Sequence, residues 1–181
     1  MESLRGKLLL AAPTLIDPNF RRSVVLVSEH NDEGAMGVVL NRPSPVTVGE
    51  AVPQLADAVD TDNAVFVGGP VQPTSIVFLG EFIEPDLASL LVFGRIGFPA
   101  ADTAIDELAE ATERTRVFAG YAGWGPGQLD DELENGDWFV EPALPADVFT
   151  DEPEALWSSV LARKGGQFAL VATMPPDPSL N

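Results

Sequence analysis

Two short segments carry side chains that could take part in acid–base chemistry or hold an anion. His30 is the only histidine and follows the run 23–29, whereas Arg42 follows the run 35–41. If these β-branched runs pair as a hairpin, we expect His30 and Arg42 to be neighbours. A histidine beside an arginine is biased towards its neutral form, which a general base requires. This arrangement predicts an enzyme for a small anionic substrate, with Arg42 as anion anchor and His30 or Glu132 as the acid/base.

The same residues also have a structural interpretation. His30 can cap a turn, and Arg42 can anchor a neighbouring loop without contacting a substrate. Ser28 would face the same side of its strand as His30, but no G-x-S-x-G elbow surrounds it. Because no complete set of nucleophile, base and orienting group is present, a binding module is the leading hypothesis and the enzyme is an alternative.

Two glycine-rich segments could form a ligand site through their backbone. Gly68-Gly69 lets the chain turn sharply and expose amides, although Pro70 removes one donor. The segment 120–129, GYAGWGPGQL, combines a strand, a glycine loop and a helix start, which favours anion binding. Asp130 in the first turn of that helix would repel a phosphate. The residues that we expect to form a ligand-binding surface are Asn41, Arg42, Gly68, Gly69, Tyr121, Gly123, Trp124 and Gln128.

Acidic side chains dominate the charge of the chain. Its 181 residues include 10 Lys or Arg and 28 Asp or Glu, which gives a formal net charge of −18. The segment 128–154 contains many acids and no Lys or Arg. Such a surface repels phosphate backbones and disfavours a nucleic-acid partner. A solvated acidic face explains the segment, and a docking face for a basic protein is the alternative.

Composition also restricts metals, cofactors and compartment. The chain has no Cys and one His, which excludes disulfides, thiolate zinc sites and multi-histidine sites. The carboxylates of segment 130–137 show no calcium-loop pattern, so we expect no metal and no cofactor. The longest apolar stretch near the N-terminus, 8–12, is too short for a signal or a membrane span. We therefore expect a cytoplasmic protein with no membrane partner, and its oligomeric state stays open.

Strand patterns come first along the chain, and they must position these residues. β-branched and apolar runs predict strands at 7–12, 23–29, 35–41, 64–67, 75–79, 88–93, 116–122 and 138–140. The polar turn 30–34 ends in glycine and joins the second and third strands as an antiparallel hairpin. Thr47 and Glu50 have the spacing of a capping box, which predicts a helix over 48–55.

Helical spacing of apolar residues is concentrated in the second half of the chain. It predicts helices over 99–114, 128–134 and 154–163, whereas 168–173 fits either a strand or a helix. Hairpins precede most of the helices, and regular strand–helix–strand units are absent. We therefore predict one α+β domain over 1–181, with a curved, largely antiparallel or mixed, barrel-like sheet flanked by helices.

Taken in order, several segments resemble the AlgH/YqgE family of bacterial proteins. They are LLLAAPTLIDPNF (8–20), RSVVLVSEHNDEGAMGVVLNRP (22–43), GGPV (68–71), GYAGWGPGQLDDEL (120–133), GDW (136–138) and the terminal DPSLN (177–181). Each motif alone is weakly specific, but the ordered set covers almost the whole chain and is specific. The resemblance implies a compact α+β domain with a curved or barrel-like sheet.

The resemblance implies little chemistry. The family has no established enzymatic activity, and a role in regulating alginate synthesis has been attached to some members without a recognisable DNA-binding motif. The basic clusters of this chain are no larger than Arg21-Arg22 and Arg163-Lys164. A regulatory role here would therefore act through a protein or small-molecule partner. Three hypotheses remain: a non-enzymatic cytosolic protein- or ligand-binding module, the enzyme described above, and a direct transcriptional regulator, which the net charge disfavours.

Overall fold

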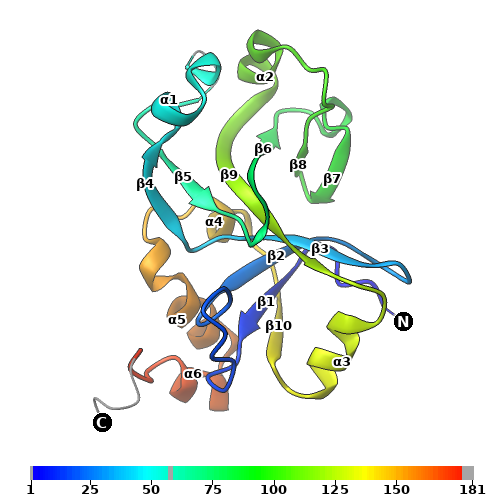
Figure 1. Ribbon diagram of the computed structural model, residues 1–181, viewed down its shortest axis with the longest axis vertical. Coiled ribbons are helices and arrows are strands. Elements are labelled where there is room, and N and C mark those ends of the chain that lie inside the picture. The colour runs from blue at the N-terminus through cyan, green and yellow to red at the C-terminus, as the bar shows by residue number, and fades with distance from the viewer. Residues whose placement is uncertain (1, 57–58, 177–181) are drawn as a thin grey trace.

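The computed structural model describes residues 2–56 and 59–176, and Figure 1 shows their arrangement. The terminal motif 177–181 lies outside the described residues. The strands are β1 (Lys7–Ala11), β2 (Val24–Asn31), β3 (Gly34–Val39), β4 (Pro43–Thr47), β5 (Ala64–Val67), β6 (Val71–Phe82), β7 (Leu90–Phe93), β8 (Ile96–Phe98), β9 (Thr112–Trp124) and β10 (Trp138–Pro142). The helices are α1 (Val48–Ala51), α2 (Ile105–Ala111), α3 (Gln128–Glu134), α4 (Pro145–Val148), α5 (Pro153–Lys164) and α6 (Gln167–Val171), with single 3-10 turns at Pro53–Leu55 and Pro85–Leu87.

One curved sheet contains all of these strands, in the order β10-β1-β2-β3-β9-β6-β8-β7, with β4 and β5 attached through β9. The long strand β9 connects the two halves: it pairs with β3 near its end and with β6 over most of its length. Its pairing with β5 is parallel, whereas the other described pairings are antiparallel. The sheet curls until β7 approaches β2, but no ladder joins these two strands among the described residues. The predicted α+β class with a curved, largely antiparallel sheet is confirmed.

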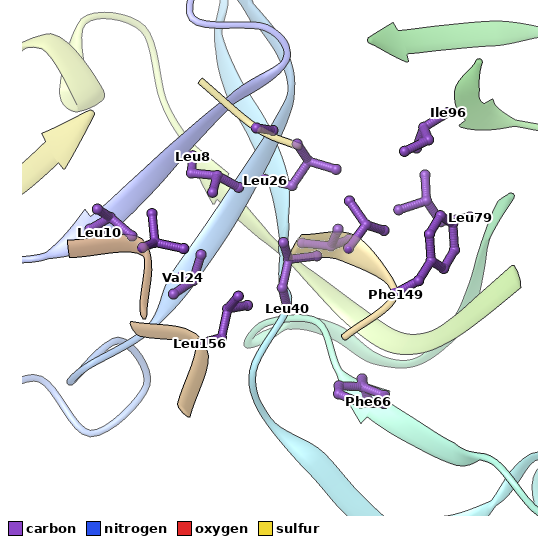
Figure 2. Close-up of a cluster of buried hydrophobic side chains, with 14 of the residues drawn as sticks. Leu8, Leu10, Val24, Leu26, Leu40, Phe66, Leu79, Ile96, Phe149 and Leu156 are labelled. Atoms are coloured by element: carbon purple, nitrogen blue, oxygen red, sulfur yellow. The ribbon is translucent and has the colours of Figure 1, made fainter. Parts of the chain in front are cut away.

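Both faces of the β1–β2–β3 part of the sheet are buried, which explains the continuous apolar run in β1. Leu8 and Leu10 pack on the face that α4 and α5 cover, and Figure 2 shows this cluster around Leu26 and Leu40. Leu9 and Ala11, which alternate with them, pack on the opposite face among the residues near α3. A strand that is buried on both sides needs apolar residues at every position. The uninterrupted apolar sequence of β1 is therefore explained by its position between β10 and β2, with both of its faces buried.

Several predicted elements have different boundaries in the structure. The helix expected over 99–114 is wrong for most of its length, because α2 covers only Ile105–Ala111 and β9 begins at Thr112. There Arg114 pairs with Glu81 of β6, and its guanidinium lies 2.7 Å from a carboxylate that is buried. This long-range ion pair and the backbone pairing of β9 with β6 outweigh the helical spacing of the apolar residues in this segment.

The predictions for short segments agree more closely with the structure where contacts between near neighbours in the chain determine the conformation. Thr47 and Glu50 form the predicted capping box at α1, but the helix stops at Ala51 and Pro53 begins a 3-10 turn. The segment 168–173, which fitted a strand or a helix, lies mostly in α6. The segment 43–47, where we predicted no strand, forms β4, a strand whose prolines suit the edge of a sheet.

The strand β10 forms one edge of the sheet, and basic side chains from the end of α5 reach its backbone. Lys164 Nζ donates to the Val140 carbonyl at 2.8 Å, and Arg163 donates to the Pro142 carbonyl at 3.3 Å. Arg163 also makes a two-fold ion pair with Asp147, which is buried. The end of α5 is thereby fixed to both α4 and β10.

Candidate functional site

The β2–β3 hairpin places His30 and Arg42 at opposite ends. His30 pairs with Ala35 beside the turn, whereas Val39 pairs with Val25, and Arg42 follows that end of β3. The expectation that His30 and Arg42 are neighbours is therefore wrong. In an antiparallel hairpin, the residue at the end of the first strand lies at the turn, and the residue after the second strand lies beside the start of the first.

His30 is a buried link between three segments. Its side chain is 2% exposed, and its Nε2 lies 3.6 Å from Asp130 Oδ1 in the first turn of α3. Its Nδ1 accepts a hydrogen bond from the Leu4 backbone N–H at 3.1 Å. A ring nitrogen that accepts a hydrogen bond carries no proton, so Nε2 is the nitrogen that can donate, and it faces Asp130. His30 thus joins the N-terminal segment, the hairpin and α3.

Glu132 lies in a cluster that we call the indole–carboxylate cluster, formed by Phe20, Trp124, Gln128, Glu132 and Trp138. The indole N–H groups of Trp124 and Trp138 donate to Glu132 at 2.9 Å and 2.8 Å. Gln128 Nε2 donates to the other Glu132 oxygen at 3.0 Å, while Gln128 Oε1 accepts from the Gly125 N–H at 3.0 Å. Both carboxylate oxygens of Glu132 therefore accept hydrogen bonds that stabilise the packing of α3 against β9 and β10.

The helix α3 separates the two acid/base candidates. Asp130, which faces His30, and Glu132 are two residues apart, which is about 200° around an α-helix. Glu132 therefore points to the two indoles and away from His30. Because Arg42 lies at the far end of the hairpin, the structure does not bring these three residues into one pocket. The enzyme hypothesis requires these three side chains in one active site, and the structure holds them apart.

Asn41 and Arg42 hold backbone segments in place. Asn41 Oδ1 accepts from the Val24 N–H at 3.0 Å, and its Nδ2 donates to the Arg22 carbonyl at 2.9 Å. The Arg42 guanidinium donates to the carbonyls of three residues of the loop before β2: Pro18, Asn19 and Arg21. Burial lowers the pKa of the Arg42 guanidinium, and the nearby Asp17 opposes this shift. Arg42 is therefore the anchor of this loop.

The Gly68-Gly69 turn crosses β9 at very short range. A Cβ on Gly68 would overlap the Gly120 carbonyl oxygen, and a Cβ on Gly69 would overlap the Tyr121 backbone. The Gly68 N–H donates to the Ala119 carbonyl at 2.9 Å, and the Gly68 carbonyl accepts from the Val39 N–H at 2.8 Å. Glycine is required because two backbones meet without room for side chains. The turn bonds β3 to β9 through its own peptide groups, so the Gly68 amide is already in use.

The predicted ligand-binding residues consequently divide into three places. Trp124 and Gln128 belong to the indole–carboxylate cluster, and Gly123 is exposed beside it in β9. Arg42 and Gly69 line a separate cavity of about 220 Å³ at the other end of the hairpin, next to Asn41 and Gly68. Tyr121 lines a third space between the two halves of the sheet.

This third space, which we call the curl cavity, has a volume of about 290 Å³. It lies where the curled sheet brings β2 and β3 opposite β6, β7 and β8. Its walls are mostly apolar, with two serines, one glutamine and one tyrosine as the polar side chains. The lining residues are Ser28, Met36, Gly37, Val38, Gln72, Ser75, Val77, Leu90, Phe98 and Tyr121.

Backbone irregularities mark two sides of the curl cavity. A β-bulge between Val27 and Glu29 aims Ser28 inwards, where it is buried and donates to the Met36 carbonyl at 3.1 Å. Gln72 has a φ of 44°, in the left-handed region that non-glycine residues rarely adopt. Its Oε1 accepts a hydrogen bond from Ser75 Oγ at 3.1 Å. Such irregularities are concentrated near functional sites.

Of the residues predicted to bind a ligand, only Tyr121 lines the curl cavity. The other lining residues come from five strands that are far apart along the chain, and most of them are ordinary strand residues. Their role follows from the curl of the sheet, which no local spacing encodes. A single signal was present: Pro70 and Pro73 flank Gln72, which suggests an irregular backbone there.

Two further findings concern metals and membranes. Across residues 2–56 and 59–176, no three His, Asp or Glu side chains gather in a group that could hold a metal ion. No helix in the same part of the chain has both the length and the apolar character needed to cross a membrane.

Solved structures show the same fold. A crystal structure of a protein from Corynebacterium diphtheriae aligns with a TM-score of 0.87 at 33% identity, covering 96% of this chain and 94% of that chain. The solution structure of the AlgH protein from Pseudomonas aeruginosa aligns with a TM-score of 0.72 at 32% identity, covering 96% and 95%.

Sequence comparisons agree with this fold assignment. A UPF0301 protein from Streptomyces coelicolor is 48% identical over 189 residues, which covers 100% of this chain and 97% of the relative. A UPF0301 protein from Thermobifida fusca is 44% identical over 191 residues, covering 99% and 96%. The AlgH-like family model matches residues 8–169. The chain therefore belongs to the AlgH-like, or UPF0301, family.

Proposed function

We propose that this protein is a non-enzymatic binding module that takes a small ligand in the curl cavity and acts in the cytoplasm. The observation that carries the proposal is the cavity itself: an apolar space of about 290 Å³ with a few convergent polar groups. Ligand pockets in proteins begin at roughly 300 Å³ and often lie in the mouths of β-barrels, and the curl of this sheet encloses a comparable space. The absence of Cys and the strongly acidic composition are consistent with a cytoplasmic location.

The alternative functions have weaker support. The acid/base candidates His30 and Glu132 are both held in structural contacts, and Arg42 lies at the other end of the hairpin. Direct contact with DNA is opposed by the net charge of −18. A regulatory role would therefore be exerted through the bound ligand or through a protein partner.

A fragment screen by NMR tests the proposal. We expect neutral fragments to shift the backbone amides of Ser28, Gly37 and Gln72 more than amides elsewhere. Val77→Phe should fill the cavity and abolish these shifts. Ile76→Phe is the matched control, because Ile76 is the adjacent β6 residue, is 43% exposed and points to the other face of the sheet. A screen without hits, or equal binding to Val77→Phe, would overturn the proposal.

A further inference from the structure

We infer that the ligand of the curl cavity is an uncharged molecule with an apolar body and a carbonyl-type acceptor, which the Gln72 carboxamide binds. This inference rests on the proposed function and adds the chemical class of the ligand. Its first basis is the absence of charge: among the described residues, none that lines the cavity is Asp, Glu, Lys, Arg or His. A charged ligand would lose its hydration there without gaining a counter-ion.

The apolar body of the ligand is matched by the side chains that face one another across the cavity. Val38 from β3 and Val77 from β6 form part of the inner face of the curl, and Leu90 and Phe98 close it from β7 and β8. These four side chains offer no hydrogen-bonding group. Contact with them is favourable only for the apolar surface of a ligand.

The acceptor is matched by the orientation of Gln72. Its Oε1 already accepts from Ser75 Oγ at 3.1 Å, so its Nε2 is the end of the carboxamide that can donate to a ligand. Ser28 Oγ is already directed to the Met36 carbonyl. Gln72 is an exposed residue of the cavity lining, and the group that its carboxamide has left for a ligand is a donor, which selects a ligand that carries an acceptor.

The backbone of Gln72 gives independent support. Its φ of 44° is one of two positive values at non-glycine residues in the described part of the chain, the other being that of Arg22. Glycine or asparagine adopts this conformation with less strain. The glutamine therefore occupies a position where the backbone alone favours another residue. Backbone strain of this kind clusters at active sites and at positions that hold ligands.

Three probes of similar size separate the elements of this inference. Benzamide is neutral and has a carbonyl, benzoate replaces the amide by a charge, and toluene has neither group. Titration of each into the labelled protein, followed through the amides of Ser28 and Gly37, gives a dissociation constant. We expect benzamide to bind about threefold to tenfold more tightly than toluene, the ratio expected for one hydrogen bond. Benzoate should bind at least about tenfold more weakly than benzamide.

Gln72→Gly is the decisive variant, because it removes the carboxamide and relieves the backbone, so the fold is not placed at risk. We expect it to remove the preference for benzamide over toluene and to leave the binding of toluene unchanged. Gln72→Asn tolerates the left-handed backbone and keeps a shorter carboxamide, so it should retain part of the preference. Val77→Phe should prevent binding of all the probes, and Ile76→Phe should prevent none.

The outcomes distinguish this inference from the proposed function. If neutral probes bind and Val77→Phe blocks them, but benzoate binds equally well or Gln72→Gly keeps the preference, the inference is overturned and the proposed function stands. If Val77→Phe leaves all binding intact, the cavity is not the site and both fail. If none of the probes binds to the natural protein, the inference fails, and the wider fragment screen decides the proposed function.

Discussion

Trp124 and Trp138 donate their indole N–H groups to the same carboxylate oxygen, Oε2 of Glu132. Their rings meet edge to face, with centroids 6.1 Å apart, and the Phe20 ring packs against both. One carboxylate thereby connects β9, α3 and β10, and the packing of Phe20 on the indoles adds the loop before β2. The conspicuous segment GYAGWGPGQLDDEL owes at least part of its composition to this contact, because it supplies one indole, the glutamine and the carboxylate.

The indole–carboxylate cluster makes Glu132 important for stability. Glu132→Gln keeps the shape but replaces an acceptor by a donor, which must face either an indole N–H or Gln128. We expect a loss of about 1–3 kcal/mol in the free energy of unfolding, the cost of an unsatisfied polar group. Urea unfolding followed by tryptophan fluorescence measures it. Glu134→Gln, an exposed carboxylate in the same helix, is the control and should change stability by less than about 0.5 kcal/mol.

The crossing of two backbones at Gly68 predicts a sharp difference between two glycines. Gly68→Ala would force its Cβ into the Gly120 carbonyl, which cannot move without disturbing β9. We expect it to lower stability by at least about 3 kcal/mol or to prevent folding. Gly123→Ala would meet Val71 only at 3.6 Å, an ordinary contact, and should fold normally. Melting temperatures of the two purified variants decide the matter, and similar values would contradict the prediction.

The ion pair between Arg163 and Asp147 should be worth more than an exposed pair. Arg163→Ala leaves the carboxylate of Asp147, which is 5% exposed, without its partner. We expect a loss of about 2–4 kcal/mol, less than for a fully buried pair because the Arg163 side chain is 31% exposed. A double-mutant cycle with Asp147→Ala measures the coupling. Additive effects of the two single changes would show that the pair contributes nothing.

The capping box at α1 should be visible in the titration of Glu50. Hydrogen bonds from the Thr47 backbone N–H and hydroxyl lower the pKa of Glu50 below its ordinary value of 4.5. The associated stability is present above pH 4.5 and is lost as the pH falls through the folded pKa. Thr47→Ala removes the hydroxyl and keeps the backbone N–H, so we expect the Glu50 pKa to rise only part of the way towards 4.5. Carboxyl carbon chemical shifts followed across this pH range give both values, and an unchanged midpoint would refute the assignment.

The three carbonyls that Arg42 binds predict a local effect of its removal. Arg42→Ala should free the loop that carries Phe20, so the amide hydrogens of Phe20 and Arg21 should exchange at least about tenfold faster. Arg42→Lys should restore little, because a single ammonium does not reproduce the planar fork of the guanidinium. Hydrogen exchange by mass spectrometry, with the β1 amides as internal reference, measures both. Unchanged protection in Arg42→Ala would exclude the anchoring role.

The sequence predicted those elements whose determinants are local. The strand at 64–67 and the helix at 128–134 have the expected boundaries, since β-branched residues specify the strand and a glycine precedes the helix. By contrast, β9 begins as early as Thr112 because Arg114 forms an ion pair with Glu81 on the neighbouring strand β6. A contact between residues that are distant along the chain has no signature in the spacing of its neighbours.

The candidate site was predictable only in part, for the same reason. The segments that stood out by composition, such as Gly68-Gly69 and 120–129, proved to be places where the backbone or the indoles pack closely. The curl cavity has Val38 and Val77 on its walls, and each is an unremarkable residue of its own strand. That both side chains line the same cavity depends on how the strands pair and curl, which the local sequence does not encode.

The basic end of α5 also protects the protein from association through its sheet. An edge strand normally presents free carbonyl groups that can template a strand from another molecule. At β10, Lys164 and Arg163 already donate to the carbonyls of Val140 and Pro142. Two of the ten basic residues of the chain thus cap one open margin of the sheet. They make addition of a further strand there unfavourable and discourage growth into fibres.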